Sequence, residues 1–115
     1  MTKARWIGAA AVAATMMAGC AGKQLPKEAI TNPGQVIFNG YGNPKATCFK
    51  CHNGDGHGAF MGPDLSVRAK KLTADKAVRT IHDGKSRMPS FKGDLTDDEM
   101  TKLADWIMTL PSNKP

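Results

Sequence analysis

The sequence predicts an all-α fold. Three segments carry helix start and stop signals: residues 32–38, 73–83 and 96–110 each begin at a residue typical of helix N-caps, and glycine or proline follows each of them within two positions. No segment shows the alternation of apolar and polar residues that is typical of a β-strand. With 115 residues, the chain is long enough for one domain at most.

The first predicted helix begins at Asn32, and Pro33 takes the first helical position, where its missing N–H matters least. Residues 36–38 form its apolar part, and Gly40 and Gly42 follow it. Because the helix is short, we expect tertiary contacts to stabilise it.

The second predicted helix runs from Thr73 to about Asp83, with Gly84 as its stop. Its apolar face consists of Ala77, Val78 and Ile81. His82 lies in the last turn, where a cationic imidazole would interact favourably with the helix dipole, and we prefer this role to metal ligation.

The last predicted helix begins with a capping box formed by Thr96 and Glu99, followed by an apolar face at helical spacing. Asp97 and Asp98 suit the positive N-terminus of the helix, and Pro111 marks its end. The apolar face is Met100, Leu103, Ala104, Ile107 and Leu110.

The N-terminus has the pattern of a secretory signal. Lys3 and Arg5 form a basic start, and residues 6–17 are uncharged but too few to span a bilayer, which needs about 20 residues. We therefore expect a signal peptide over residues 1–19, a tether over 20–31 and a folded domain over 32–115.

Cys20 follows that segment, and Met17-Ala18-Gly19-Cys20 resembles the lipobox of bacterial lipoproteins. In those proteins the cysteine is diacylated and becomes the first residue of the mature chain. The alternatives are an ordinary signal cleaved nearby or an uncleaved anchor, either of which leaves a free thiol. A lone reactive thiol in an exported protein is a liability, which favours lipidation. Multiple acyl chains would hold the protein firmly on a membrane.

The net charge argues against nucleic acid as a partner. The formal charge is +6, of which Lys3 and Arg5 contribute two, and no basic run is interleaved with aromatic residues. A protein partner with an acidic docking face is the more natural inference.

Cys48-Phe49-Lys50-Cys51-His52 is the most informative motif of the chain. Two cysteines three positions apart, followed at once by histidine, are typical of covalent haem attachment, with a thioether from each thiol and the imidazole on the iron. The alternatives are a disulfide, a thioredoxin-like redox pair or half of a zinc site. A zinc site would have only His57 and His82 left as further ligands, and a thioredoxin-like motif would need a βαβ setting.

A glycine-rich loop follows this motif. Its glycines, at positions 54, 56, 58 and 62, allow positive φ angles and let the backbone pass close to a flat ligand. It is not a phosphate-binding loop, because no strand precedes it and no lysine follows in the required way. We expect His57 in this loop to be exposed to solvent.

A second axial ligand must come from elsewhere in the chain. The candidates are Met61, Met88, Met100, Met108, His57 and His82. Met100 belongs to an apolar helix face, and Met61 lies in the loop that must wrap the proximal side. Met88 precedes Pro89, which favours an extended backbone, so its side chain is the best placed to project inward.

From about Gly34 to Leu110 the chain resembles the small bacterial class I c-type cytochromes. Gly34 and Phe38 match the first-helix positions that cross the last helix, here near Leu103, Trp106 and Ile107. The sequence Gly62-Pro63-Asp64-Leu65 matches the family's Gly-Pro-x-Leu, and Met88-Pro89 matches its distal loop.

The resemblance implies three to four helices wrapped around one haem c attached through Cys48 and Cys51. His52 is then the proximal ligand, oriented by the Pro63 carbonyl, and Met88 the distal ligand.

This resemblance implies an electron carrier, not an enzyme. We expect a monomer in the periplasmic part of a bacterial cell envelope, held on the membrane by a lipid on Cys20. A quinol-oxidising complex or dehydrogenase would be the donor, and an oxidase, reductase or other cytochrome the acceptor. The residues that could steer an acidic partner are Lys70, Lys71, Lys85, Arg87 and Lys92. The alternative is a haem enzyme or sensor with a labile Met88.

Overall fold

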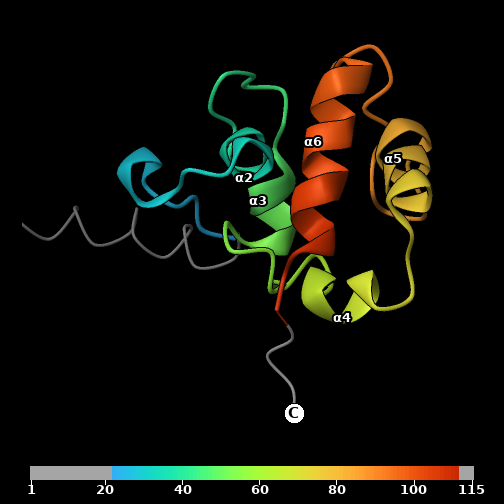
Figure 1. The fold of residues 1–115 in the computed structure, drawn as a ribbon, viewed down its shortest axis with the longest axis horizontal. Helices are drawn as coiled ribbons and strands as arrows, with labels where there is room; N and C mark the ends of the chain where they lie inside the picture. The colour runs from blue at the N-terminus through green and yellow to red at the C-terminus, as the bar shows by residue number, and fades with distance from the viewer. Residues whose placement is uncertain (1–21, 112–115) are drawn as a thin grey trace, which may run out of the picture.

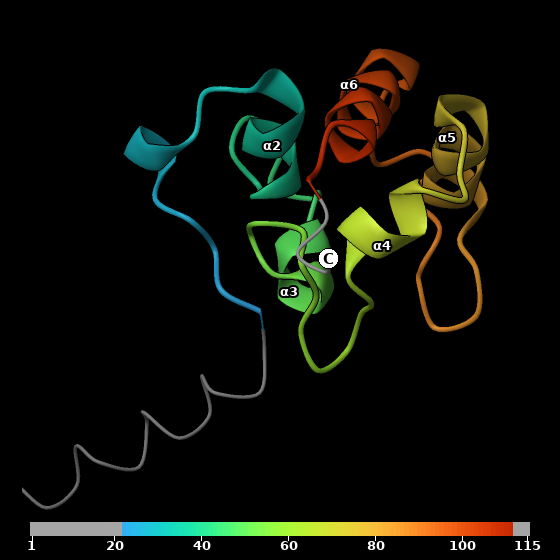
Figure 2. The ribbon, with the colours of Figure 1, turned by 60° about the horizontal axis from the view of Figure 1, so that its bottom comes forward.

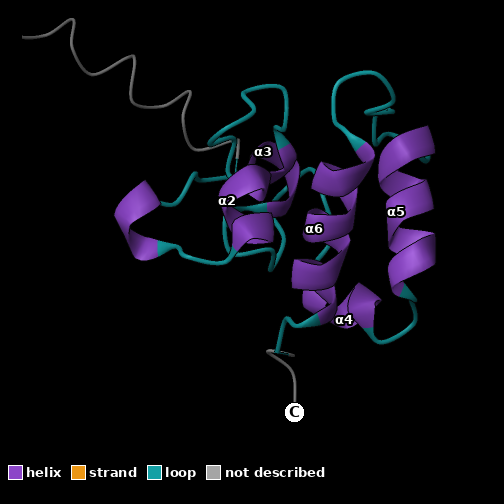
Figure 3. Cartoon of the chain, turned by 45° about the horizontal axis from the view of Figure 1, so that its top comes forward, coloured by secondary structure: helices purple, strands orange, loops and turns teal. Residues whose placement is uncertain are grey.

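The computed structural model describes residues 22–111, and this range is helical with no β-strand, only two isolated bridges (Figure 3). The elements are a 3₁₀ turn, η3 (Lys27–Ala29), and the helices α2 (Pro33–Phe38), α3 (Cys48–His52), α4 (Leu65–Ala69), α5 (Ala74–Asp83) and α6 (Asp97–Met108). The all-α prediction is confirmed.

The described range holds more helices than the three to four expected, because α4 escaped the sequence analysis. It is five residues long, too short to show helical periodicity, and it begins where the Asp64 carboxylate accepts the N–H of Ser66.

The predicted signal segment and Cys20 lie outside the described residues. Between residues 22 and 111, no helix is long and apolar enough to cross a membrane.

The helix α6 is the centre of the fold. It stands between α2 and α3 on one side and α5 on the other, with α4 near its C-terminal end (Figure 1), and it packs against α2, α4 and α5. Its buried residues are Met100, Leu103, Ala104, Trp106 and Ile107. Burying this face is the main apolar contribution to the core.

The sequence-predicted helix boundaries are confirmed by the caps. Asn32 accepts the N–H of Gly34, Thr73 accepts the N–H of Lys76, and the capping box at the start of α6 has both of its reciprocal hydrogen bonds. Gly84 follows α5 with a φ of 78°, a left-handed value that glycine adopts without strain.

The contact between α2 and α6 depends on Gly34. A Cβ at this position would overlap the carbonyl oxygen of Lys102 and lie 2.6 Å from Cβ of Trp106. One turn later, the rings of Phe38 and Trp106 pack with centroids 4.8 Å apart at 57°. The expected crossing of the first and last helices is therefore confirmed.

Within the segment expected as a tether, residues 22–25 instead pack on the domain. The N–H of Gly22 donates to the carbonyl oxygen of Lys50 in α3 at 2.8 Å, and the N–H of Gly54 donates to the carbonyl oxygen of Lys23 at 2.8 Å. The buried side chain of Asn39 accepts the N–H of Leu25 and donates to the carbonyl of Gly54. These bonds satisfy backbone groups on both segments, so residues 22–25 belong to the fold.

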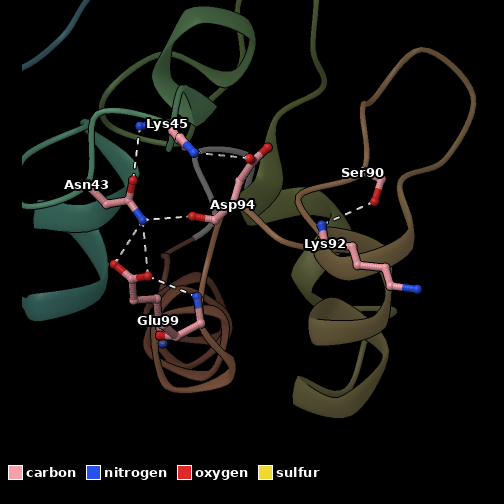
Figure 4. Close-up of polar contacts among 7 residues, drawn as sticks. Asn43, Lys45, Ser90, Lys92, Asp94 and Glu99 are labelled. Atoms are coloured by element: carbon pink, nitrogen blue, oxygen red, sulfur yellow. Dashed lines mark hydrogen bonds and ion pairs between the residues drawn. The ribbon is translucent and has the colours of Figure 1, made fainter.

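A polar cluster fastens the loop before α3 to the start of α6 (Figure 4). The Asn43 amide donates to the Asp94 carbonyl at 3.0 Å and to both Glu99 carboxylate oxygens at 3.1 and 3.2 Å. Lys45 forms an exposed ion pair with Asp94 at 3.8 Å. The cluster limits the paths by which the chain can enter α3.

Candidate functional site

A cavity of about 340 Å³ opens between α3, α4, α5 and the loops that follow α3 and α5. Both loops project to the same side of the molecule in Figure 2. The lining residues are Thr47, Cys48, Cys51, His52, Met61, Pro63, Leu65, Arg68, Leu72, Thr80, Lys85, Ser86, Arg87, Met88, Pro89 and Phe91. A cavity of this size, mostly apolar with a few convergent polar groups, is typical of a cofactor site.

The three residues of the Cys-x-x-Cys-His motif line this cavity together because α3 is a single helical turn. Residues three and four positions apart lie on one helix face, so Cys48, Cys51 and His52 point the same way. Asn53 ends the turn with a φ of 62°, after which the glycine-rich loop reverses the chain.

His52 is buried and oriented by the loop that follows it. Its Nδ1 lies 3.0 Å from the carbonyl oxygen of Pro63, and since a carbonyl only accepts, Nδ1 carries the proton. Gly62 permits this approach, because a Cβ there would lie 2.9 Å from Nδ1. The other nitrogen, Nε2, keeps a lone pair for a metal.

Burial also sets the protonation of this site. It lowers the pKa of His52, against the opposing effect of the hydrogen bond to Pro63, so the ring is neutral at neutral pH. Burial raises the pKa of the Cys48 thiol to about 12. A neutral thiol is a poor nucleophile for disulfide exchange, which uses the thiolate.

Zinc is disfavoured within the described residues. No three side chains among His, Cys, Asp and Glu in residues 22–111 come close enough to hold a metal ion. Cys48 and Cys51 are both free thiols. The residues that line the cavity instead fit a haem, with two thiols at the attachment spacing, a neutral oriented imidazole and mainly apolar surroundings.

Met88 lines the cavity and is half-buried. A tight turn holds it, because Lys85 and Met88 exchange two backbone hydrogen bonds, of 3.0 and 2.9 Å. Ser86 takes a φ of 54° in this turn, in the left-handed region that non-glycine residues rarely adopt. The two hydrogen bonds hold the backbone at Met88.

Of the other methionines, Met61 also lines the cavity, although its side chain is 54% exposed. Met100 is buried in the core as expected, at 2% exposure, and Met108 packs against the core. The structure therefore brings two methionines, Met61 and Met88, to the cavity.

The expectation of a solvent-exposed His57 is wrong. Its side chain is 20% exposed, and Nδ1 lies 3.4 Å from Oδ1 of Asp64, a pairing that no sequence pattern predicted. The folded glycine loop brings the two together across the chain reversal. His82 lies at the end of α5, its Nδ1 2.6 Å from Oδ1 of Asp83, and neither histidine lines the cavity.

The charged side chains on the lining are positive and exposed: Arg68, Lys85 and Arg87. Lys85 and Arg87 were predicted from the sequence as steering residues. Arg68 was not, because it lies on α4, the unpredicted helix. Lys70, Lys71 and Lys92 are exposed but do not line the cavity.

Comparison with known proteins gives a consistent result. A family model described as cytochrome c oxidase, cbb3-type, subunit III matches residues 32–107, more than half of the chain. The chain is 28% identical over 96 residues to cytochrome c6 of Gracilaria tenuistipitata var. liui, covering 78% of this chain and 82% of that protein. It is 26% identical over 110 residues to cytochrome c6 of Thermosynechococcus vestitus (strain NIES-2133 / IAM M-273 / BP-1), covering 92% of this chain and 91% of that protein.

Proposed function

The chain belongs to this family of class I c-type cytochromes and carries electrons on one covalently bound haem c, and we propose that His52 and Met88 would be the protein ligands of its iron. When bound, the haem supplies the one-electron couple of its iron. Cys48 and Cys51 would hold it by thioethers.

The observation that carries the proposal is the contact between His52 and Pro63 in a cavity that Met88 also lines. The Pro63 carbonyl selects the tautomer of His52 and prevents the ring from turning, which strengthens the imidazole as a ligand. The apolar side chains around the site would limit the access of water to a bound haem, and a methionine ligand would raise its potential relative to a second histidine. With His52 and Met88 both as ligands, the site would leave no position for oxygen or peroxide.

The assignment of Met88 is tested against Met61, the other methionine on the lining. In the ferric wild type we expect the weak methionine-to-iron charge-transfer band at the red end of the visible spectrum. Met88→Ala should lose the band and bind cyanide rapidly, whereas Met61→Ala should keep the band. The reverse pattern would identify Met61 as the ligand, and a wild type that lacks the band and binds cyanide would favour the haem enzyme or sensor.

The redox partners of this protein are other proteins, and we propose that they include a quinol-oxidising complex or dehydrogenase and an oxidase, reductase or cytochrome. An acidic docking face fits Lys85 and Arg87, which are exposed on the lining of the cavity. If these charges steer the encounter, the rate of electron transfer to the partner should fall steeply as the salt concentration rises. A Lys85→Glu, Arg87→Glu double variant should make this salt dependence weaker. A salt-independent rate in the wild type would contradict steering.

We also propose export to the periplasmic side of a bacterial cell envelope and acylation of Cys20. Gly22 is bonded to α3, and two extended residues reach only about 7 Å. An acylated Cys20 would therefore hold the domain close to the membrane surface. Mass spectrometry of the N-terminal peptide should show the acyl chains on Cys20, and Cys20→Ser should release the protein from membranes. An unmodified Cys20 would refute the anchor.

A further inference from the structure

Two large hydrophobic side chains are exposed within residues 22–111, and they are neighbours: Phe60, at 89%, and Met61, at 54%. Single exposed hydrophobic residues are common on protein surfaces and need no explanation. An adjacent pair of such size, beside a cofactor cavity, is less readily explained by chance.

The backbone presents this pair at the tip of a turn. The N–H of Ala59 donates to the carbonyl of Gly62 at 3.1 Å, so Phe60 and Met61 occupy the two positions between them. The N–H of Gly58 donates to the carbonyl of His52 at 2.9 Å, which fastens the base of the turn to α3. Because the turn is already ordered, burying the pair would need little further ordering of the backbone.

The surroundings of the pair are positively charged. Met61 lines the cavity together with Arg68, Lys85 and Arg87, and no acidic residue among residues 22–111 lines it. An apolar centre beside a cationic rim is complementary to an apolar recess bordered by carboxylates. A second copy of this chain would bring the same positive rims together, which disfavours self-association.

We propose that Phe60 and Met61 are the apolar anchor of a transient interface with an acidic redox protein. The inference rests on the proposed electron-transfer function and adds to it which surface the partner covers. Burial of the pair would bring the partner against the mouth of the cavity that holds His52 and Met88. A contact of two side chains with a charged rim suits the small interfaces of electron-transfer encounters.

The test measures steady-state oxidation of the haem-loaded protein by a purified cytochrome c oxidase with an acidic docking face. Phe60→Ser should raise the KM about tenfold with little change in kcat, the size of effect expected for loss of a buried aromatic anchor. Phe60→Leu, the matched control, keeps an apolar side chain and should change the KM by less than about threefold. An unchanged KM in Phe60→Ser, or an equal loss in both variants, would overturn the proposal.

Three further measurements separate the proposed partner interface from a failure of electron transfer, from self-association and from membrane binding. Reduction of the haem by ascorbate should be identical in all variants, and a wild-type haem that cannot be reduced and reoxidised would refute the electron-transfer function itself. Sedimentation velocity should show a monomer, since self-association abolished by Phe60→Ser would assign the pair to a second copy. Binding to phosphatidylglycerol vesicles that Phe60→Ser abolishes, with an unchanged KM, would assign the pair to a membrane surface.

Discussion

Replacing Gly34 by alanine tests the helix crossing on which the fold depends. The added Cβ would meet the backbone of α6 and lie 2.6 Å from Cβ of Trp106, whereas carbon atoms normally stay about 3.5–4.0 Å apart. The helices would have to separate by about 1 Å, and such overpacking typically costs about 1–3 kcal/mol. Alanine gains up to about 1 kcal/mol of helix propensity, which offsets part of this cost. Since the clash involves backbone, we expect a net loss of about 2 kcal/mol.

Thermal unfolding of the haem-loaded protein measures this loss. In a domain of this size, about 2 kcal/mol corresponds to a decrease in Tm of about 8–16 °C. Gly42→Ala is the matched control, because nothing lies within 4 Å of a Cβ there and only the φ of 85° opposes the substitution. We expect Gly42→Ala to lose about 1 kcal/mol of unfolding free energy. A Gly34→Ala protein as stable as the wild type would refute the close packing of α2 and α6.

Three other variants test the cofactor, the buried amide and the capping box. A Cys48→Ser, Cys51→Ser double variant should lose most of its helicity without haem, because the cavity of about 340 Å³ would remain unfilled; a cooperative thermal transition from native helix content, followed by circular dichroism, would contradict this. Asn39→Ala leaves buried partners unsatisfied and should lower the unfolding free energy in urea by about 2 kcal/mol, whereas an unchanged midpoint would argue against this role. The hydrogen bond from the Thr96 N–H holds the pKa of Glu99 below its usual value, so this carboxylate stabilises the fold above the ordinary glutamate pKa of about 4.3 and the contribution is lost as the pH falls through the lowered value. Acid titration of Glu99→Gln should show a shallower loss of stability in that window, and an identical curve would contradict the argument.

The helices that could be predicted are those whose signals are local. Thr73 with Gly84, and Thr96 with Glu99, lie within a few residues of the backbone groups they cap, so the sequence alone marks both boundaries. The helix α4 is too short to show a periodic apolar face, although Asp64 caps it. Arg68, which this helix brings to the cavity, was therefore not predicted.

The residues of the candidate site also fall into those that a local pattern predicts and those that it does not. Cys48, Cys51 and His52 share one helical turn, and this spacing by itself predicts covalent haem attachment. The position of Met88 before Pro89 favoured it as the second ligand. The role of Pro63 came only from resemblance to a family, because the spacing of distant residues does not predict which side chains meet. The pairing of His57 with Asp64 had no sequence signal at all.

The sequence by itself determined the all-α class, the main helix boundaries and the haem attachment motif, since all three depend on contacts between residues close in the chain. Only the tertiary structure decided that residues 22–25 pack on α3 and Asn39, that Met61 shares the cavity with Met88, and that Phe60 is left exposed beside it. These features depend on how the loops fold back on the helices. Loop paths are set by hydrogen bonds and packing between segments far apart in the chain, which no local pattern encodes.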